Sequence, residues 1–379
     1  MIYKDFKGLK LSALGMGAMR LPVIDGDDSK IDVSAAEKMV DYAIKNGVNY
    51  FDTAWGYHNG HSEEVMGKAL SKYPRNSYFL ADKFPGYDLS NMDKVEEIFE
   101  AQLKKCGVEY FDFYLFHNVC EMNIDDYTNE KHGIFSYLIK QKENGRIKHL
   151  GFSAHGGIDV MERFLKAYGS EMEFCQIQLN YVDWSFQNAK GKVELLKKYG
   201  IPVWVMEPLR GGKLIDIAES DVDRLKSLRP DEKTTAWPFR FLQSLPEVVV
   251  TLSGMSNLEQ LKENILVFDE NKALNDEEMN TILGIADGMV SKTALPCTAC
   301  HYCVSHCPKG LDIPSLLSLY NEHCFTGGTF NFIAPMALMA VPKEKWPSAC
   351  IGCRSCEAVC PQQIKISEAM KDFSEKLGQ

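Results

Sequence analysis

The stretch NYFDTAWGYHNGHSEEVMGKALSKY, residues 49–73, joins an apolar run to an amphipathic segment through a short glycine-containing turn. The aromatic run 49–54 predicts a buried strand. Residues 62–73 carry apolar side chains at helical spacing and predict a helix that covers that strand. This stretch therefore reads as one strand–turn–helix unit.

The same unit recurs on both sides of this stretch. Further strand-like segments, with helical segments between most of them, are 9–17, 78–84, 110–117, 147–155, 174–181, 201–209 and 247–254. Several of them are apolar on both faces, which is typical of parallel strands covered on both sides. Eight β/α units in about 270 residues predict an α/β fold, a (β/α)8 TIM barrel. An open doubly wound sheet is the alternative.

A different pattern begins after a last helical segment, 276–290. Cysteines 297, 300, 303 and 307 follow the pattern C-x2-C-x2-C-x3-C-P, and cysteines 350, 353, 356 and 360 repeat it. We therefore expect two domains, a barrel over 1–291 and a small, mainly α-helical dicluster ferredoxin-like domain over 292–379.

The spacing of the two motifs favours two [4Fe–4S] clusters over zinc. Zinc usually takes two separated pairs of ligands, whereas three closely spaced thiolates can surround one corner of a cubane cluster. The fourth cysteine, before proline, ligates the other cluster in such motifs. The expected ligand sets are Cys297, Cys300, Cys303 and Cys360 for one cluster, and Cys350, Cys353, Cys356 and Cys307 for the other.

The motifs resemble those of bacterial dicluster ferredoxins, although the long gap between them is more similar to α-helical ferredoxin modules of larger oxidoreductases. Cys106, Cys120, Cys175 and Cys324 lack ligand spacing, and we expect them to be buried apolar side chains.

Four polar residues fall at or just after consecutive predicted strand ends in the first 120 residues. They are Asp52, Tyr57, Lys83 and His117. A phenol has a pKa near ~10, and a neighbouring ammonium group lowers it. An aspartate would hold the lysine, and a neutral histidine would orient a substrate oxygen. The set suits proton transfer to a carbonyl oxygen while hydride reaches its carbon.

These residues in their context, FDTAWGYHNGHSEEVMGKAL, ADKF and YLFH, resemble the aldo/keto reductase superfamily. The resemblance covers roughly 1–290. With the cysteine motifs it points to the branch that carries a C-terminal 4Fe-4S dicluster domain. It implies Asp52, Tyr57, Lys83 and His117 as the catalytic tetrad and NAD(H) or NADP(H) as cofactor.

The resemblance also implies the residues that would contact the dinucleotide. They are Ser153, Gln176, Met206, Leu209, Gly211, Gly212, Lys213, Gly254, Gln260, Glu263 and Asn264. Met206 stands where the family usually stacks a tyrosine on the nicotinamide. Gly254 and Gln260 stand where NADPH-preferring members carry cations, which weakens the case for NADPH.

The net charge of −10 argues against binding to nucleic acid or to an anionic membrane. No signal peptide or membrane span is recognisable, and cysteines arranged as ligands suggest the cytoplasm.

Three functions stay open at this point. The first is hydride transfer between the nicotinamide and a small carbonyl or alcohol, with structural or docking clusters. The second is electron transfer between the clusters and a bound flavin or a ferredoxin-like partner, although no flavin motif is recognisable. The third is a redox-sensing module without catalysis.

Overall fold

The computed structural model describes residues 1–327 and 332–379. Its packing divides the chain into two compact units, Met1–Ile282 and Leu283–Gln379. The expected boundary at 291/292 lies at the end of helix α12 (Asp276–Ser291), which spans the junction of these units.

The first unit is a closed eight-stranded parallel barrel, so the TIM-barrel prediction is confirmed and the open sheet is wrong. Strand β10 pairs with both β9 and β3, which closes the sheet. The barrel strands are β3 (Leu14–Gly17), β4 (Tyr50–Asp52), β5 (Phe79–Phe84), β6 (Phe111–Val119), β7 (Ile147–Ala154), β8 (Cys175–Gln178), β9 (Val203–Met206) and β10 (Val248–Gly254).

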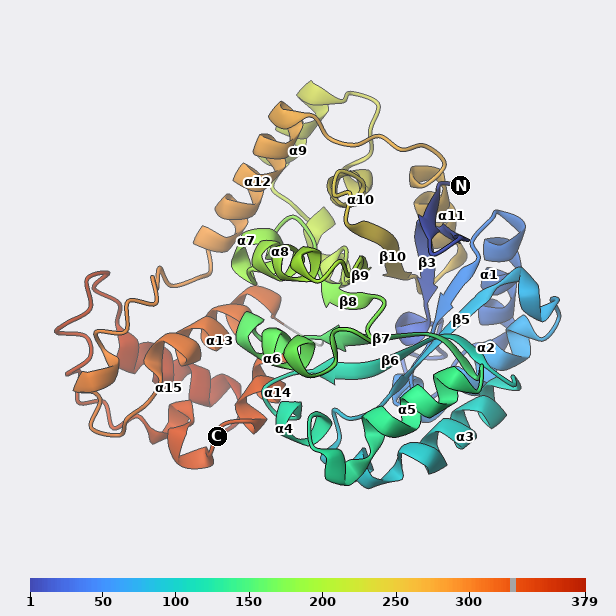
Figure 1. Cartoon of the computed structure of the whole chain (residues 1–379). Coiled ribbons are helices and arrows are strands. Elements are labelled where there is room, and N and C mark those ends of the chain that lie inside the picture. The colour runs from blue at the N-terminus through green and yellow to red at the C-terminus, as the bar shows by residue number, and fades with distance from the viewer. Residues whose placement is uncertain (328–331) are drawn as a thin grey trace. The chain divides into compact units, whose positions relative to one another are not determined.

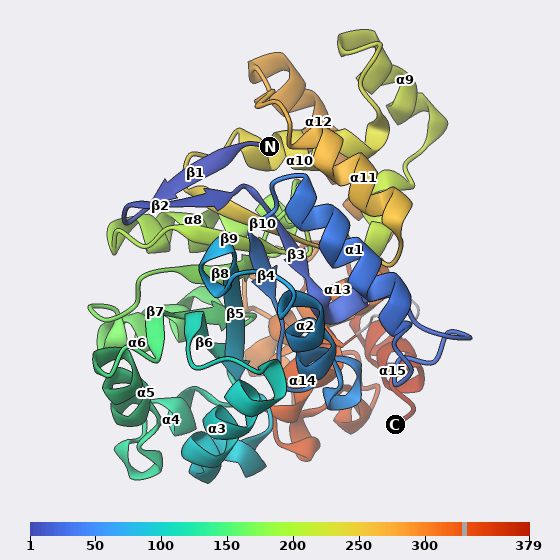
Figure 2. The same ribbon diagram turned by 90° about the vertical axis from the view of Figure 1, so that its right-hand side faces the viewer.

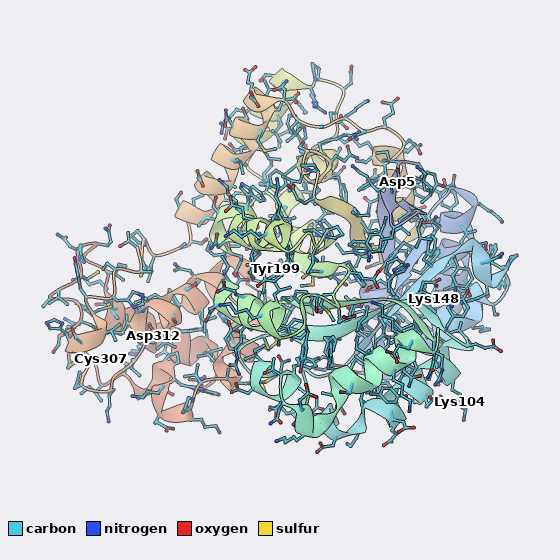
Figure 3. All side chains as sticks on the ribbon, viewed as in Figure 1. Asp5, Lys104, Lys148, Tyr199, Cys307 and Asp312 are labelled. Carbon is cyan, nitrogen blue, oxygen red and sulfur yellow. The ribbon has the colours of Figure 1, made fainter. Side chains whose placement is uncertain are left out.

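Helices follow each strand and lie outside the barrel (Figure 1, Figure 2). Their apolar faces are buried and their polar side chains, such as Lys104 on α3, lie on the outer surface (Figure 3). The main helices are α1 (Val33–Lys45), α2 (Ser62–Leu70), α3 (Val95–Cys106), α5 (Ile134–Glu143), α6 (Ile158–Tyr168), α8 (Ala189–Lys198), α9 (Glu219–Leu228), α10 (Trp237–Gln243) and α11 (Leu258–Val267). Two single-turn helices precede α5 and α8, namely α4 (Ile124–Tyr127) and α7 (Asp183–Phe186).

The expected first strand, 9–17, is two strands. The chain bends at Ala13, and the hydroxyl of the preceding Ser12 donates to the Leu14 carbonyl oxygen at 2.7 Å. Residues Leu9–Ser12 form β2, which pairs antiparallel with β1 (Tyr3–Phe6). Phe6 and Leu11 of this hairpin pack in one cluster with barrel residues such as Trp204. The N-terminal residues of the strands are therefore covered, and the opposite ends carry the polar side chains described below.

The second unit is mainly α-helical, as expected. Its helices are α13 (Ile313–Thr326), α14 (Ile333–Met339) and α15 (Ile366–Lys376). Side chains such as Leu317, Leu338 and Phe373 share a small core with Cys303 and Cys356. Among the described residues of the whole chain, no helix is long and apolar enough to span a membrane.

Candidate functional site

Three residues of the predicted tetrad lie on the adjacent strands β4, β5 and β6, and the fourth lies in the turn after β4. Asp52 ends β4, Lys83 lies near the end of β5, and the two strands pair in register through Asp52 and Ala81. His117 follows on β6, at an irregularity where the register shifts and Asn118 adopts a φ of 60°. Such bulges redirect a side chain at the rim of a barrel. Tyr57 begins the turn that follows β4.

Lys83 and Asp52 form a buried ion pair. The Lys83 Nζ lies 2.6 Å from Asp52 Oδ1 and 2.7 Å from the Thr53 carbonyl oxygen. Burial lowers the pKa of Lys83, but the charges of Asp52 and Tyr57 outweigh it and raise the pKa to about 12. The lysine is therefore protonated at neutral pH, and its Nζ lies 5.0 Å from the centre of the Tyr57 ring.

The pKa of Tyr57 differs from the expectation. Burial raises it and Lys83 lowers it, with a net rise above the ordinary phenol value. The sequence analysis considered only the lysine, whereas the structure adds the larger effect of desolvation. Tyr57 consequently holds its proton at neutral pH, which suits a proton donor.

His117 is neutral. Burial lowers its pKa well below the ordinary value, and the positive charge of Lys83 lowers it further. Its Nδ1 is buried and has no hydrogen-bond partner among the described residues. A neutral ring with a free polar atom at this rim is suited to binding a ligand.

Two predicted nicotinamide contacts are neighbours in the sheet. Ser153 of β7 and Gln176 of β8 pair in register. The Ser153 hydroxyl accepts a hydrogen bond from the Asn118 backbone N–H at 2.7 Å, and its own proton stays available for donation. Gln176 Oε1 is buried without a hydrogen-bond partner among the described residues. A free acceptor beside a hydroxyl donor fits a carboxamide group, so these residues fit the expected cofactor.

A cavity of about 180 Å³ brings together most of the other predicted dinucleotide contacts. Its lining includes Leu209, Gly211, Gly212, Gly254, Gln260, Glu263 and Asn264. Gly211 and Gly212 have φ values of 67° and 95°, which favour glycine. Met206 and Lys213 do not line this cavity.

The sequence analysis missed Arg20, which is the only cation among the described residues lining this cavity. Its guanidinium nitrogen lies 3.3 Å from a carboxylate oxygen of Glu207, a residue far along the barrel sequence that follows β9. No local pattern marked it, because only closure of the barrel brings β3 next to β10.

The turn after β4 has mainly structural contacts. Trp55 is covered by Lys105, whose Nζ lies 3.9 Å from the ring centre. The His58 Nε2 accepts a hydrogen bond from the Leu21 backbone N–H at 3.1 Å.

Tyr87, in the loop after β5, was also missed by the sequence analysis. Its ring lies edge-on to His117 with 5.1 Å between ring centres.

The cysteine motifs of the second unit share one backbone conformation. In the first, Ala299, His301 and Gly310 have positive φ values. The matching positions of the second motif are Gly352, Arg354 and Gln363, which also have positive φ values. Each motif then leads into a helix that begins with isoleucine, α13 or α15, and Figure 3 marks Cys307 and Asp312 just before α13. The repeat seen in the sequence is thus a structural repeat.

The expected ligand sets are grouped in space. Cys307 lines one cavity with Cys350, Cys353 and Cys356. Burial and then the charges of Cys350, Glu357 and Cys307 raise the pKa of Cys356 to about 11.

The pKa of Cys303 is raised by burial and then by Cys297, Cys300 and Cys360. In the described part of the chain, no three His, Cys, Asp or Glu side chains converge on a single metal ion.

Of the four cysteines outside the motifs, all expected to be buried, three are buried and one is not. Cys106, Cys120 and Cys175 are buried, as expected. Cys324 is only half-buried, because it lies near the end of α13 and lines a surface cavity.

Comparison with known proteins agrees with both units. The model of the Aldo/keto reductase family matches residues 13–287. The chain belongs to the aldo/keto reductase family. The model of the 4Fe-4S dicluster domain matches residues 296–365, so this family member carries that domain at its C-terminal side.

Individual relatives are distant. L-galactose dehydrogenase of Arabidopsis thaliana is 24% identical over 294 residues, which cover 72% of this chain and 88% of the relative. NADH-specific methylglyoxal reductase of Escherichia coli is 23% identical over 329 residues, which cover 74% and 96%.

A solved aldo-keto reductase of Bacillus halodurans in its holo form superposes with a TM-score of 0.61. It is 22% identical and the match covers 75% of this chain and 96% of that one. This similarity supports the fold.

Proposed function

We propose that this aldo/keto reductase transfers hydride between a nicotinamide dinucleotide and a small carbonyl or alcohol, with Tyr57 as the proton donor and acceptor. The observation that carries the proposal is the neutral Tyr57 phenol beside the buried Lys83–Asp52 pair. A bound nicotinamide would supply the hydride to the carbonyl carbon or take it from the alcohol.

In this mechanism the residues of the barrel do the acid–base work. Tyr57 donates its proton to the carbonyl oxygen, and Lys83 stabilises the phenolate that remains. Asp52 keeps Lys83 charged and in position. Neutral His117 orients the substrate oxygen, and Ser153 and Gln176 would hold the carboxamide group of a bound nicotinamide. The predicted dinucleotide residues that line the cavity with Gly211 and Gly254 would bind the rest of the cofactor.

The test is an anaerobic titration of the purified protein with NADH and then NADPH, followed by a panel of carbonyls. We expect nucleotide to bind and a carbonyl to oxidise it. Failure of both nucleotides to bind would overturn the proposal.

We further propose that residues 292–379 hold two [4Fe–4S] clusters, with the fourth cysteine of each motif ligating the other cluster. The grouping of Cys303 with Cys360 and of Cys356 with Cys307 supports this crossed arrangement. Cysteine ligands that must stay reduced suit the cytoplasm.

Paired substitutions test the crossed arrangement. The wild type should contain about eight iron atoms per chain. Cys297→Ser with Cys360→Ser removes ligands of one cluster and should leave about four iron atoms. Cys297→Ser with Cys307→Ser affects both clusters and should leave few. Equal iron content in the two double variants would contradict crossed ligation.

A second candidate function is one-electron exchange with a ferredoxin-like partner or a bound flavin. The exposed thiols of Cys300 and Cys353, one in each ligand set, favour it because clusters held there would lie near the surface. Bleaching of the cluster absorbance during the same nucleotide titration, or release of a flavin, would support this function. If the clusters stay oxidised, the result would favour a structural role for them or a role in docking a partner.

A further inference from the structure

Tyr87 is a second phenol beside the predicted tetrad. Its ring meets the His117 ring edge-on, with 5.1 Å between centres and an angle of 88°. Tyr57 meets the same imidazole at 6.2 Å and 82°. His117 therefore lies between two tyrosines, and only one of them has a role in the proposed mechanism.

The loop that carries Tyr87 is fixed to the strand that carries His117. The Tyr127 hydroxyl donates to the His117 carbonyl oxygen at 2.7 Å and accepts from the Gly86 backbone N–H at 3.1 Å. Asn123 Nδ2 donates to the Gly86 carbonyl oxygen at 3.0 Å. A Cβ at Gly86 would lie 2.3 Å from the Tyr127 hydroxyl. Tyr87 is thus held on a built support.

Gly56 makes room for the Tyr87 hydroxyl. A Cβ at position 56 would lie 2.3 Å from that oxygen. The backbone of Gly56, with φ −92° and ψ −4°, is open to any residue, so the space and not the conformation requires glycine here. The hydroxyl consequently lies against the residue that precedes Tyr57.

The Tyr87 hydroxyl is a neutral donor. Burial raises the pKa of Tyr87 to about 12, and the negative charge of an ionised Tyr57 would add to this rise. The Tyr87 ring contacts the His117 ring, and the Tyr87 hydroxyl makes no hydrogen bond to another residue in the described parts of the chain. The Tyr87 oxygen is not one of the buried polar atoms that lack a partner in the described residues, so water can reach it, and a ligand oxygen can take the place of that water.

We propose that Tyr87 determines substrate specificity, with its ring holding His117 in place and its hydroxyl donating to a second oxygen next to the reacting carbonyl. The preferred substrates are then 2-hydroxy- or 2-oxo-carbonyl compounds rather than simple aldehydes or ketones. This inference rests on the proposed hydride transfer at Tyr57. A site that hydrogen-bonds a substrate oxygen discriminates against the analogue that lacks it.

The first test compares 2-hydroxypropanal with propanal, which differ by one hydroxyl. Tyr87→Phe keeps the ring and removes the donor. We expect it to lower kcat/KM for 2-hydroxypropanal about five- to tenfold and to leave propanal nearly unchanged. Tyr110→Phe is the matched control, because Tyr110 directly precedes β6 at the other end of the strand from His117.

The outcomes separate this inference from the function on which it rests. Wild-type protein that reduces neither aldehyde would overturn the proposed function and this inference with it. Wild-type protein that reduces both, with the same ratio of kcat/KM in Tyr87→Phe, would overturn this inference alone.

The second test measures the positioning of His117 without any cofactor. Tyr87→Ala removes the ring and opens His117 to water, so the pKa of His117 should rise toward the ordinary histidine value in an NMR titration. An unchanged His117 pKa would contradict the positioning role.

Gly56→Ala should impair turnover of both aldehydes by displacing Tyr87, and adding Tyr87→Ala should relieve that clash. Gly56→Ala with wild-type turnover would contradict the placement of the Tyr87 hydroxyl.

Discussion

Lys83 links chemistry to stability at the scale of one residue. Its side chain has no exposed surface, and the Asp52 side chain is only 3% exposed. Among the described residues, Asp52 is the only one whose carboxylate forms an ion pair with Lys83. Burial favours the neutral amine, and the pair with Asp52 reverses that preference. Removing one partner of such a pair leaves the other charge buried and unpaired.

Lys83→Met should therefore destabilise the barrel by about 3–5 kcal/mol, measured as the free energy of unfolding in guanidinium chloride. Lys83→Met combined with Asp52→Asn should recover much of that loss, because no buried charge remains. The control is Lys197→Met, which breaks an exposed pair and should change stability by less than about 1 kcal/mol. Equal losses in the single and double variants would argue against a charged pair.

The pH dependence of turnover follows from two shifted groups. Tyr57 must be protonated to donate, and its pKa is raised, so carbonyl reduction should hold through neutral pH and fall as pH rises through that pKa. Alcohol oxidation needs the phenolate and should rise over the same range. The pKa of His117 is lowered, so its protonation should reduce turnover only well below pH ~6.5. A pH–rate profile of kcat/KM with an acidic limb near that value would contradict a neutral His117.

The proximity of the four proposed tetrad residues could be predicted from sequence, because strand ends in a parallel barrel share one rim. The direction of the Tyr57 pKa shift could not, because it depends on how deeply the phenol is buried. Tyr87 and Arg20 were missed since the first lies in an aperiodic loop and the second reaches its cavity only through barrel closure.

At the scale of elements, helices α2 and α3 approach closely at Gly67. A Cβ at this position would lie 2.4 Å from the Cys106 backbone oxygen. Helix propensity favours alanine over glycine by about 1 kcal/mol, but a clash with backbone cannot be relieved by a rotamer change.

Gly67→Ala should therefore lower the free energy of unfolding by about 1–3 kcal/mol. Gly288→Ala in α12 is the matched control, because a Cβ there meets no atom within 4 Å. That control should raise stability by up to about 1 kcal/mol. If both variants change the free energy of unfolding in the same direction, the result would contradict the close approach of α2 and α3.

The periodicity located every barrel strand within a few residues, but it merged β2 with β3. A hairpin strand and a barrel strand that follow each other show the same apolar alternation, and only the bend at Ala13 separates them. The cysteine spacing indicated the repeat of the second unit. The paired left-handed positions could not be predicted, because Ala299 of the first motif and Gln363 of the second are residue types that rarely adopt positive φ.

At the scale of the whole molecule, the two units have separate cores. The core of the second unit is small and includes Cys303 and Cys356, so its packing depends on residues that we assign to the clusters. Ligands of this kind fold with their metal.

Anaerobic removal of iron by a chelator should unfold the second unit and leave the barrel folded. Scanning calorimetry should show loss of one transition and retention of the barrel transition. A barrel transition lost together with the iron would show that the two units are not independent in stability.

The most direct test of the central claim is Tyr57→Phe, compared with wild type in the same anaerobic assay of carbonyl-dependent NADH or NADPH oxidation. Loss of the proton donor should lower kcat by about 10²–10⁴-fold, while the nucleotide dissociation constant changes little. Turnover near that of the wild type would contradict Tyr57 as the acid and the hydride-transfer chemistry built around it.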